Sequence, residues 1–393
     1  MSGRPRLLAV NHTTMFAGAE QNLCDLLVRL PAEHVDVLGV VAPGRGPLTQ
    51  RLAELGIPTF DLPVPHLAGA RSPIPFVRGL ARWAGFTRRL GDLFETLAPD
   101  VVYASSPHAA IATEPALSRA RLPWLWQMPD LVRPTRFNRL ALRRALGRSD
   151  RIVAISEATA SSLRALGADN GRIDLVYCAV DAAAFRRSPT DGAEVRRELG
   201  IPAGAPVVGM FGQITRWKGW HILVEGLPSL GAAHPGVHFL FVGRPVWPED
   251  QEYAAQLRRE VEDAGMAGAV RWTGFRADVA RLMGICDVIV HASVRPEPLG
   301  VVIMEAMAAG AAVVCTRGGG TEEMVTDGVT GLVVEPGHAE ELTSAVAGLL
   351  ATPARRSRMG ALGAEQAAQR FTHEARVAAF GRLIRAAAGR DEE

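Results

Sequence analysis

The chain of 393 residues contains few cysteines, almost no lysine and no long hydrophobic run. Its four cysteines, Cys24, Cys178, Cys286 and Cys315, form no C-x-x-C pair. We therefore expect neither a zinc site nor a disulfide framework, and the expected compartment is a reducing cytoplasm. No stretch approaches 18 uncharged apolar residues, and the N-terminus shows no cleavable signal pattern, so no membrane-spanning helix is expected.

Lysine occurs once among 43 basic residues, at position 218. A chain biased towards Arg can keep a lysine by chance, or because a compact, flexible point charge is needed at that place. The net charge of +2 does not indicate a nucleic-acid partner. No Asp-x-Asp sequence and no set of His and carboxylates with metal-ligand spacing is present, so we expect no metal ion and no cofactor.

The length predicts two domains, and short apolar runs alternate with amphipathic stretches in both halves, which is typical of parallel α/β folds. Residues 186–205, rich in Pro, Gly, Ser and Asp, are the expected linker between domains at 1–185 and 206–371. Residues 372–393 contain a closing helix, expected at 372–388. Strands are expected at 6–11, 35–42, 100–104, 124–127, 151–155, 173–176, 207–211, 237–242, 270–273, 288–291, 312–315 and 331–334.

Two carboxylates, Glu297 and Glu305, bracket a predicted turn after a strand and the start of a short helix. Pro298 and Gly300 suit that turn. Backbone N–H groups at such a helix start would face an anion at the carboxyl edge of a parallel sheet, and a carboxylate accepts hydrogen bonds from sugar hydroxyls. Taken alone, the spacing is more typical of an ordinary turn acid followed by a surface glutamate.

The loop at 212–219 follows the first strand expected in the second half. It contains Gly212, Arg216 and Lys218, and it precedes a helix expected at 220–226. A glycine-containing loop with two cations at a helix start is arranged to bind a diphosphate. A solvated basic loop is the alternative. It is less favoured when the single lysine of this loop is considered together with the pair Glu297 and Glu305.

With these motifs the sequence resembles glycosyltransferase family 4, the retaining enzymes of the group 1 type. The resemblance implies an α/β GT-B fold, in which two Rossmann-like domains face one another across a cleft and the C-terminal helix crosses back to the N-terminal domain. It implies a hexosyltransferase that moves sugar from a nucleoside-diphosphate sugar to an acceptor hydroxyl with retention. The motifs that carry it are Glu297-x7-Glu305 with Ala306–Gly310, the Gly319–Glu323 run, Lys218-Gly219, the segment Arg151–Glu157 and Ala17-Gly18-Ala19-Glu20.

The resemblance also implies roles for individual residues. Lys218, helped by Arg216, would neutralise the diphosphate of the donor. Glu297 would meet the donor sugar, Glu305 the ribose of the nucleotide, and Gly18 the reaction cleft. The phosphates would lie against the Gly212 loop and the backbone of Leu299, Gly300, Val301 and Val302.

Three histidines, His12, His108 and His291, fall near predicted strand ends. Each is more often structural than catalytic at such a place. His108 is the expected acceptor-side residue.

The sequence departs from the family pattern at three places. Gln213 stands where an Arg often follows the glycine of the phosphate loop, and segment 124–130 lacks the His that the first domain often carries. The usual Asn-Gly before the linker is Cys178-Ala179. These departures leave the expected contacts to the diphosphate and the ribose unchanged. The family's mode of donor-sugar recognition applies less directly to this sequence.

Arginines crowd the segment 133–151 beside several apolar residues. This pattern is typical of an amphipathic helix with a solvated face, or of a surface that docks an anionic or lipid-linked acceptor at the inner face of a membrane. The acceptor class stays open between a glycan, a lipid-linked sugar and a small natural product.

Four other functions share features with this sequence. A sugar-nucleotide epimerase and a non-catalytic sugar-nucleotide-binding protein would share the architecture. A phosphorylase would need a lysine for pyridoxal phosphate, and the single lysine already lies in the phosphate loop. A dehydrogenase is disfavoured because its glycine fingerprint is matched only partly, at 44–49.

Overall fold

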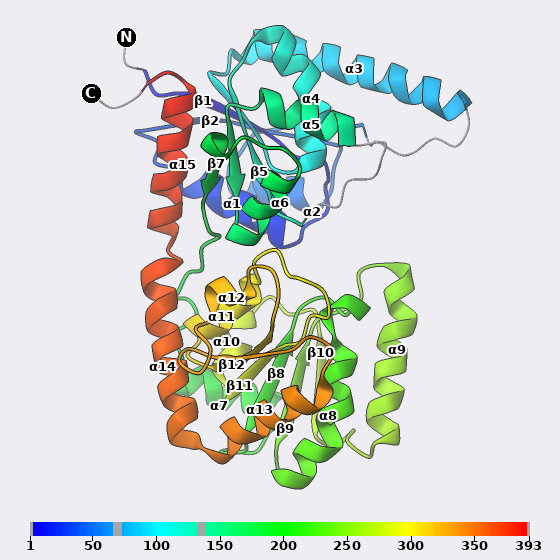
Figure 1. Ribbon diagram of the computed structural model, residues 1–393, viewed down its shortest axis with the longest axis vertical. Coiled ribbons are helices and arrows are strands. Elements are labelled where there is room, and N and C mark those ends of the chain that lie inside the picture. The colour runs from blue at the N-terminus through cyan, green and yellow to red at the C-terminus, as the bar shows by residue number, and fades with distance from the viewer. Residues whose placement is uncertain (1–2, 66–72, 132–138, 391–393) are drawn as a thin grey trace. The chain divides into compact units, whose positions relative to one another are not determined.

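The computed structural model describes residues 3–65, 73–131 and 139–390. The chain divides into two compact units. Unit 1 consists of residues 1–179 and 373–393, and unit 2 of residues 180–372. Each unit is a parallel β-sheet with helices on both faces (Figure 1).

The sheet of unit 1 has seven strands in the order β3-β2-β1-β4-β5-β6-β7. Its central strands are buried along their whole length, as expected for parallel strands covered by helices on both sides. Its strands are β1 (Arg6–Val10), β2 (Asp36–Ala42), β3 (Thr59–Asp61), β4 (Val101–Ala104), β5 (Trp124–Met128), β6 (Arg151–Ala154) and β7 (Ile173–Leu175). Its helices are α1 (Gly18–Arg29), α2 (Pro47–Glu54), α3 (Pro73–Leu97), α4 (Pro107–Ala120), α5 (Arg139–Arg148), α6 (Glu157–Ala165), the 3-10 turn η1 (Asn170–Arg172) and α15 (His373–Ala387).

Side chains alternate along β1 between two hydrophobic layers, because successive residues of a strand point to opposite faces. Leu8 and Val10 pack in the layer that contains α3, α4, α5 and α6. Leu7 and Ala9 pack in the layer that contains α1, α2 and α15. The last helix is therefore part of the core of unit 1.

Helix α15 returns the chain to unit 1 after unit 2 is complete. It lies against α1 and β5 (Figure 1). The Phe380 ring is buried and meets the Tyr103 ring edge-on, with ring centroids 5.6 Å apart. Arg376, also buried, donates a hydrogen bond of 3.4 Å to Oδ1 of Asn22 on α1.

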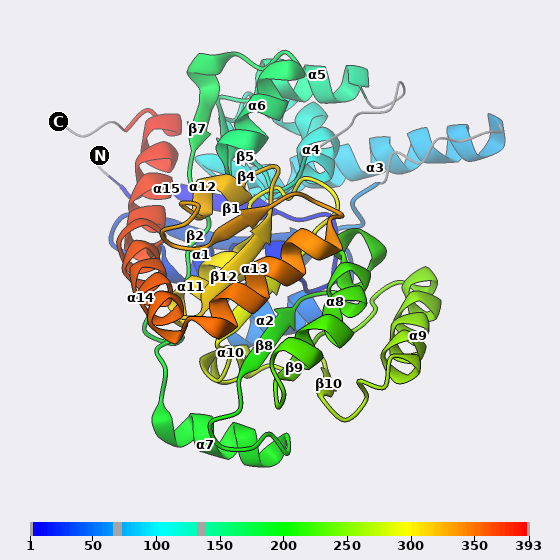
Figure 2. The ribbon, with the colours of Figure 1, turned by 60° about the horizontal axis from the view of Figure 1, so that its bottom comes forward.

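The sheet of unit 2 has six strands in the order β10-β9-β8-β11-β12-β13. Helices α8 and α13 lie side by side over this sheet (Figure 2). The strands are β8 (Val207–Phe211), β9 (His238–Val242), β10 (Val270–Gly274), β11 (Val288–His291), β12 (Ala312–Thr316) and β13 (Leu332–Val334). The helices are α7 (Pro189–Glu198), the 3-10 turn η2 (Arg216–Lys218), α8 (Trp220–Ala233), α9 (Pro248–Asp263), α10 (Val279–Gly284), α11 (Val301–Ala308), α12 (Thr321–Met324), α13 (Ala339–Ala351) and α14 (Pro353–Arg370).

The segment 186–205, predicted as a linker, contains helix α7. Ser188 caps this helix by accepting a hydrogen bond of 3.3 Å from the Asp191 N–H, and Pro189 occupies its first turn. Ser, Pro and Asp favour helix starts as well as loops. Composition alone therefore does not distinguish this helix from a linker. Helix α7 packs on α10, which places the segment within unit 2.

The basic segment expected at 133–151 is described only in part, because residues 132–138 lie outside the described ranges. Helix α5 exposes Arg139, Arg143 and Leu140, the last with 79% of its surface accessible. Within the described residues, no helix is long and apolar enough to cross a membrane. The peripheral membrane contact and the cytoplasmic location stay predictions.

We predict that Phe380→Ala destabilises the protein by about 3–5 kcal/mol, because it leaves a cavity beside Tyr103 in the core of unit 1. Urea unfolding followed by tryptophan fluorescence measures this loss. The matched control is Arg382→Ala, which removes an exposed side chain of the same helix and should change stability little. Equal unfolding midpoints for the two variants would contradict the packing of α15 described here.

Candidate functional site

The strand order of unit 2 reverses direction between β8 and β11, which are neighbours in the sheet. Chain segments leaving the carboxyl ends of two such strands run to opposite sides, and open α/β sheets bind ligands at this switch point. The loop after β8 carries Lys218, and the loop after β11 carries Ser293 and Glu297. The fold thus brings together the lysine and the first glutamate that the sequence singled out.

Backbone contacts hold these two loops together. The Val294 N–H donates a hydrogen bond of 2.8 Å to the Trp217 carbonyl. Gly219 has φ of +74°, and a Cβ built there would lie 1.9 Å from the Ala292 carbonyl oxygen. A side chain at position 219 would therefore push the two loops apart, which explains the glycine that follows the lysine.

Lys218 and Glu297 form an ion pair between Nζ and Oε1. Glu297 is only 6% exposed, and its second oxygen, Oε2, accepts a hydrogen bond of 3.1 Å from the Ser293 hydroxyl. Nε2 of His291, at the end of β11, lies 3.2 Å from Oγ of Ser293 and 3.7 Å from Oε2 of Glu297. Nζ of Lys218 also lies over the Trp217 ring, 4.2 Å from its centroid. These side chains form one connected polar cluster.

The backbone of Glu297 is fixed by the glycine run after β12. The Gly320 N–H donates a hydrogen bond of 2.8 Å to the Glu297 carbonyl. Gly319 has φ of +73°, and a Cβ there would lie 1.9 Å from that same carbonyl oxygen. The glycines predicted as part of the motif therefore allow a close approach that orients the carboxylate.

Glu297 is ionised at neutral pH. Burial alone would raise its pKa, but the neighbouring His291 and the positive charge of Lys218 outweigh burial and lower the pKa to about 2. The carboxylate is thus present as a hydrogen-bond acceptor across the physiological range.

Gly300 is the N-cap residue that precedes helix α11 and has a left-handed φ of +91°, and no side chain caps this helix start in the described structure. The first amides of a helix have no partner within it and carry the positive end of the helix dipole. The backbone of Leu299, Gly300, Val301 and Val302 lies at the carboxyl edge of the sheet, and its contact with a phosphate stays a prediction.

Glu305, one turn into α11, differs from Glu297. It is half-buried, and within residues 3–65, 73–131 and 139–390 its side-chain carboxyl group makes no hydrogen bond and no ion pair. Burial raises its pKa to about 7. Both oxygens of this carboxyl group are therefore left to accept hydrogen bonds from water or from ligand hydroxyls.

Arg216 lies differently from Lys218. Its guanidinium stacks on the Tyr253 ring, 4.8 Å from the centroid, and donates a hydrogen bond of 3.2 Å to Gln256 on α9. Arg216, predicted as the second cation for a diphosphate, is thus bound to side chains of α9 in this structure. Gln213 contributes its backbone carbonyl, which accepts a hydrogen bond of 2.9 Å from the Trp220 indole.

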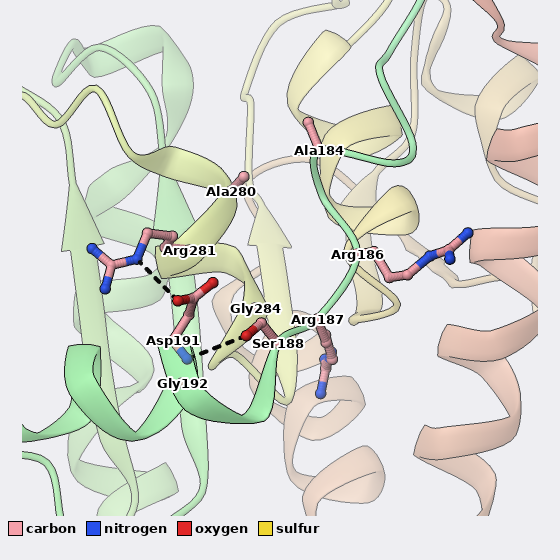
Figure 3. Close-up of a pocket in the computed structure, with 9 residues that line it drawn as sticks. All are labelled: Ala184, Arg186, Arg187, Ser188, Asp191, Gly192, Ala280, Arg281 and Gly284. Carbon is pink, nitrogen blue, oxygen red and sulfur yellow. Dashed lines mark hydrogen bonds and ion pairs between the residues drawn. The ribbon is translucent and has the colours of Figure 1, made fainter.

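The C-terminal end of α11 is held by Arg187, whose guanidinium is partly buried and which the sequence did not single out. The Arg187 guanidinium donates hydrogen bonds of 2.7 Å and 3.1 Å to the carbonyls of Ala309 and Gly310, and one of 2.6 Å to that of Cys286. Burial lowers its pKa from the ordinary value. Figure 3 shows Arg187 at the rim of a small pocket with the Arg281–Asp191 ion pair. The residues that line this pocket include none of the predicted donor-site residues, so we assign Arg187 a structural role at the end of α11.

Unit 1 has a polar cluster of its own at the corresponding switch point, between β1 and β4. Nδ1 of His12 lies 2.9 Å from Oγ of Ser106, and the His12 and His108 rings stack with centroids 5.0 Å apart. Gly18 is exposed at the start of α1, and the Glu20 carboxylate accepts a hydrogen bond of 3.2 Å from the Ala17 N–H. Gly18 and His108 thus lie in unit 1 and the other predicted site residues in unit 2.

Sequence reasoning missed the pairing of His12 with Ser106 and the link from Ser293 to Glu297. His12, Ser106 and Ser293 each lie just after the carboxyl end of a strand, and Glu297 lies further along the loop after β11. That position is the signal that could have indicated them.

Comparison with protein-family models matches residues 191–366 to Glycosyl transferases group 1 and residues 17–179 to a Glycosyl transferase 4-like domain. The lipopolysaccharide core biosynthesis glycosyltransferase LpsE of Rhizobium meliloti is 35% identical over 48% of this chain and 52% of its own length. A GDP-mannose-dependent phosphatidylinositol monomannoside mannosyltransferase of Mycolicibacterium smegmatis is 31% identical over 63% of this chain and 65% of its own. The chain thus spans about half to two thirds of these curated relatives.

Among solved structures, Anabaena Alr3699/HepE in complex with UDP has a TM-score of 0.83. It is 26% identical, over 97% of this chain and 100% of that one. WaaG, a glycosyltransferase involved in lipopolysaccharide biosynthesis, is 16% identical with a TM-score of 0.72, which supports the GT-B fold.

We predict that Glu305→Gln stabilises the protein at pH 8 by about 1–3 kcal/mol and leaves its stability unchanged at pH 4. The pKa of Glu305 is about 7 in the folded state and near 4.5 in an unfolded chain, so ionising this group costs folding free energy as the pH rises from 4.5 to 7. The amide removes that cost. The difference between variant and wild type, measured by urea unfolding at each pH, isolates it from other titrations.

The control for this measurement is Glu262→Gln, which changes an exposed carboxylate on α9. It should leave the stability difference near zero at both pH values. A Glu305→Gln variant that is less stable than wild type at pH 8 would contradict the absence of a protein partner for Glu305.

Proposed function

Because the chain belongs to the group 1, family 4-like glycosyltransferases with the GT-B fold, we propose that it transfers a hexosyl-type sugar from a nucleoside-diphosphate sugar to an acceptor hydroxyl. The observation that carries the proposal is the pairing of Lys218 with Glu297 at the switch point of unit 2, beside the uncapped start of α11. A cation, free helix amides and two carboxylates of different character suit a ligand that combines a diphosphate with hydroxyl groups.

In this proposal the diphosphate lies against the amides at the start of α11 and is neutralised by Lys218. Ligand phosphate would then compete with Glu297 for the ammonium group, and donor sugar hydroxyls would donate hydrogen bonds to the Glu297 carboxylate. Glu305 would accept both ribose hydroxyls. Fixed charges and amides that face the leaving diphosphate stabilise the charge that develops on it during transfer, so no metal ion is required.

The proposed reaction forms a bond between the acceptor oxygen and the anomeric carbon while the bond from that carbon to the diphosphate oxygen breaks. The proton of the acceptor hydroxyl passes to the leaving phosphate oxygen on the same face of the sugar. Retention of configuration follows from this front-face arrangement, and no protein base is needed. Retention rests on the family resemblance stated above.

The relatives narrow the donors to be tested first. HepE is described in complex with UDP and with UDP-glucose, and the Mycolicibacterium relative is described as GDP-mannose-dependent. UDP-glucose and GDP-mannose are therefore the first two donors to test, and the acceptor class stays open. The relatives reported above are described as glycosyltransferases, so they do not favour the epimerase or the binding-protein alternative.

We predict that Lys218→Ala lowers kcat/KM for transfer or for slow donor hydrolysis about 10²–10³-fold, because one charge-stabilising donor is removed. Mass spectrometry of released nucleoside diphosphate measures the rate. Lys218→Arg should recover part of the loss, since the charge returns with a different geometry. Arg216→Ala, which removes a cation held by Tyr253 and Gln256, should have a much smaller effect.

Near-normal turnover by Lys218→Ala would refute the role of the lysine. A loss as large in Arg216→Ala would show that Arg216 leaves α9 to join the site. Because the lysine variant leaves Glu297 without its charge partner, its thermal midpoint must be measured alongside to separate misfolding from catalysis.

We predict a division of roles between the two glutamates. Glu297→Gln should lower turnover more than nucleoside-diphosphate affinity, because it touches the sugar. Glu305→Gln should lower nucleoside-diphosphate affinity more than turnover at saturating donor, because it touches the ribose. Calorimetric titration together with steady-state rates separates the two effects, and equal losses of binding in both variants would contradict the division.

A further inference from the structure

Glu297 is oriented by a chain of hydrogen bonds that begins at His291. The Ser293 hydroxyl has one proton and donates it to Oε2 of Glu297, at 3.1 Å. Oγ of Ser293 can then only accept from Nε2 of His291, which lies 3.2 Å away. Nε2–H of His291 therefore donates to the Ser293 hydroxyl, and this hydroxyl donates to the Glu297 carboxylate. The direct distance from Nε2 to Oε2, 3.7 Å, is too long for a hydrogen bond.

The other ring nitrogen of His291 shows that packing alone does not explain the residue. His291 is 5% exposed, and its Nδ1 has no hydrogen-bond partner among the described residues. A buried polar atom without a partner destabilises a fold, and an apolar residue of similar volume would avoid that cost. The presence of an imidazole here is therefore explained by the hydrogen bond that its Nε2–H group donates.

We infer that His291 is a positioning residue of the donor-sugar site, acting on Glu297 through Ser293. The inference rests on the proposed function. The chain of hydrogen bonds holds Oε2 on the side of β11, so that Oε1 faces Lys218. A second contact supports the serine, because the Thr316 hydroxyl on β12 donates a hydrogen bond of 2.7 Å to the Ser293 carbonyl. With His291 in place, the carboxylate presents one orientation to sugar hydroxyls.

The substitutions that test this differ in where they place an N–H donor. The amide of His291→Gln reaches the position of Nε2 and can donate to Ser293. The amide of His291→Asn ends near the position of Nδ1 and cannot. His291→Leu fills the volume without a donor, and Ser293→Ala removes the intermediate hydroxyl.

Calorimetric titration with UDP and UDP-glucose, and with GDP and GDP-mannose, provides the readout. For the pair that binds wild-type protein, His291→Asn, His291→Leu and Ser293→Ala should lose about tenfold in affinity for the nucleotide sugar. Their affinity for the nucleoside diphosphate, which lacks the sugar, should change less than about twofold. His291→Gln should stay near wild type. In a Glu297→Gln background, His291→Asn should cause no further loss.

The inference is overturned if His291→Leu binds the nucleotide sugar as wild type does, because the residue then only fills space. It is also overturned if both nucleotides lose affinity equally, or if the loss persists in the Glu297→Gln background. Thermal midpoints of the variants distinguish loss of the site from loss of folding. If wild-type protein binds none of the four nucleotides, the proposed function itself fails, and that outcome is separate from failure of this inference.

Discussion

Lys218 and Glu297 stand 79 positions apart in sequence, and the ion pair between them depends on most of unit 2. It requires β8 and β11 to be neighbours, the glycines at 219 and 319 to permit close backbone approaches, and the hydrogen bond between Val294 and Trp217. A buried pair of this kind contributes little net stability, because desolvation offsets most of the attraction. In the proposed function the pair holds a cation and a hydrogen-bond acceptor in fixed positions for a ligand with both phosphate and hydroxyl groups.

The two glutamates of the motif lie in different environments, which matches the different roles proposed for them. Glu297 is surrounded by donors and ionised well below neutral pH, whereas Glu305 has no donor among the described residues and a pKa of about 7. The spacing of eight residues fixes which loop and helix carry them. Their environments come from neighbours that are distant in sequence, which is why spacing alone cannot distinguish the two roles.

Much of the fold could be predicted from the sequence, because parallel strands buried on both faces appear as short apolar runs. The expected strands at 207–211 and 288–291 coincide with β8 and β11. The positions of these strands place Lys218 and Glu297 in the loops that follow them. Helix α7 was missed because Ser188, Pro189 and Asp191 suit a linker as well as a helix start. The position of Arg216 on Tyr253 could not be predicted, since α9 is remote in sequence and its contact is set by packing. The hydrogen bonds that link His291 to Glu297 through Ser293 could not be predicted either, because their geometry depends on the conformation of the turn after β11.

We propose that unit 2 binds a nucleoside-diphosphate sugar without a metal ion. The most direct test is the thermal midpoint of wild-type protein, freed of metal by chelation, in the presence of UDP, GDP, UDP-glucose, GDP-mannose or NAD. A ligand at 100 times its Kd adds about 2.7 kcal/mol of stability, which is visible as a shift of the midpoint. One nucleoside diphosphate and the matching nucleotide sugar should raise the midpoint, and NAD should not. Stabilisation by NAD alone, or by a nucleotide only when magnesium is restored, would contradict this proposal.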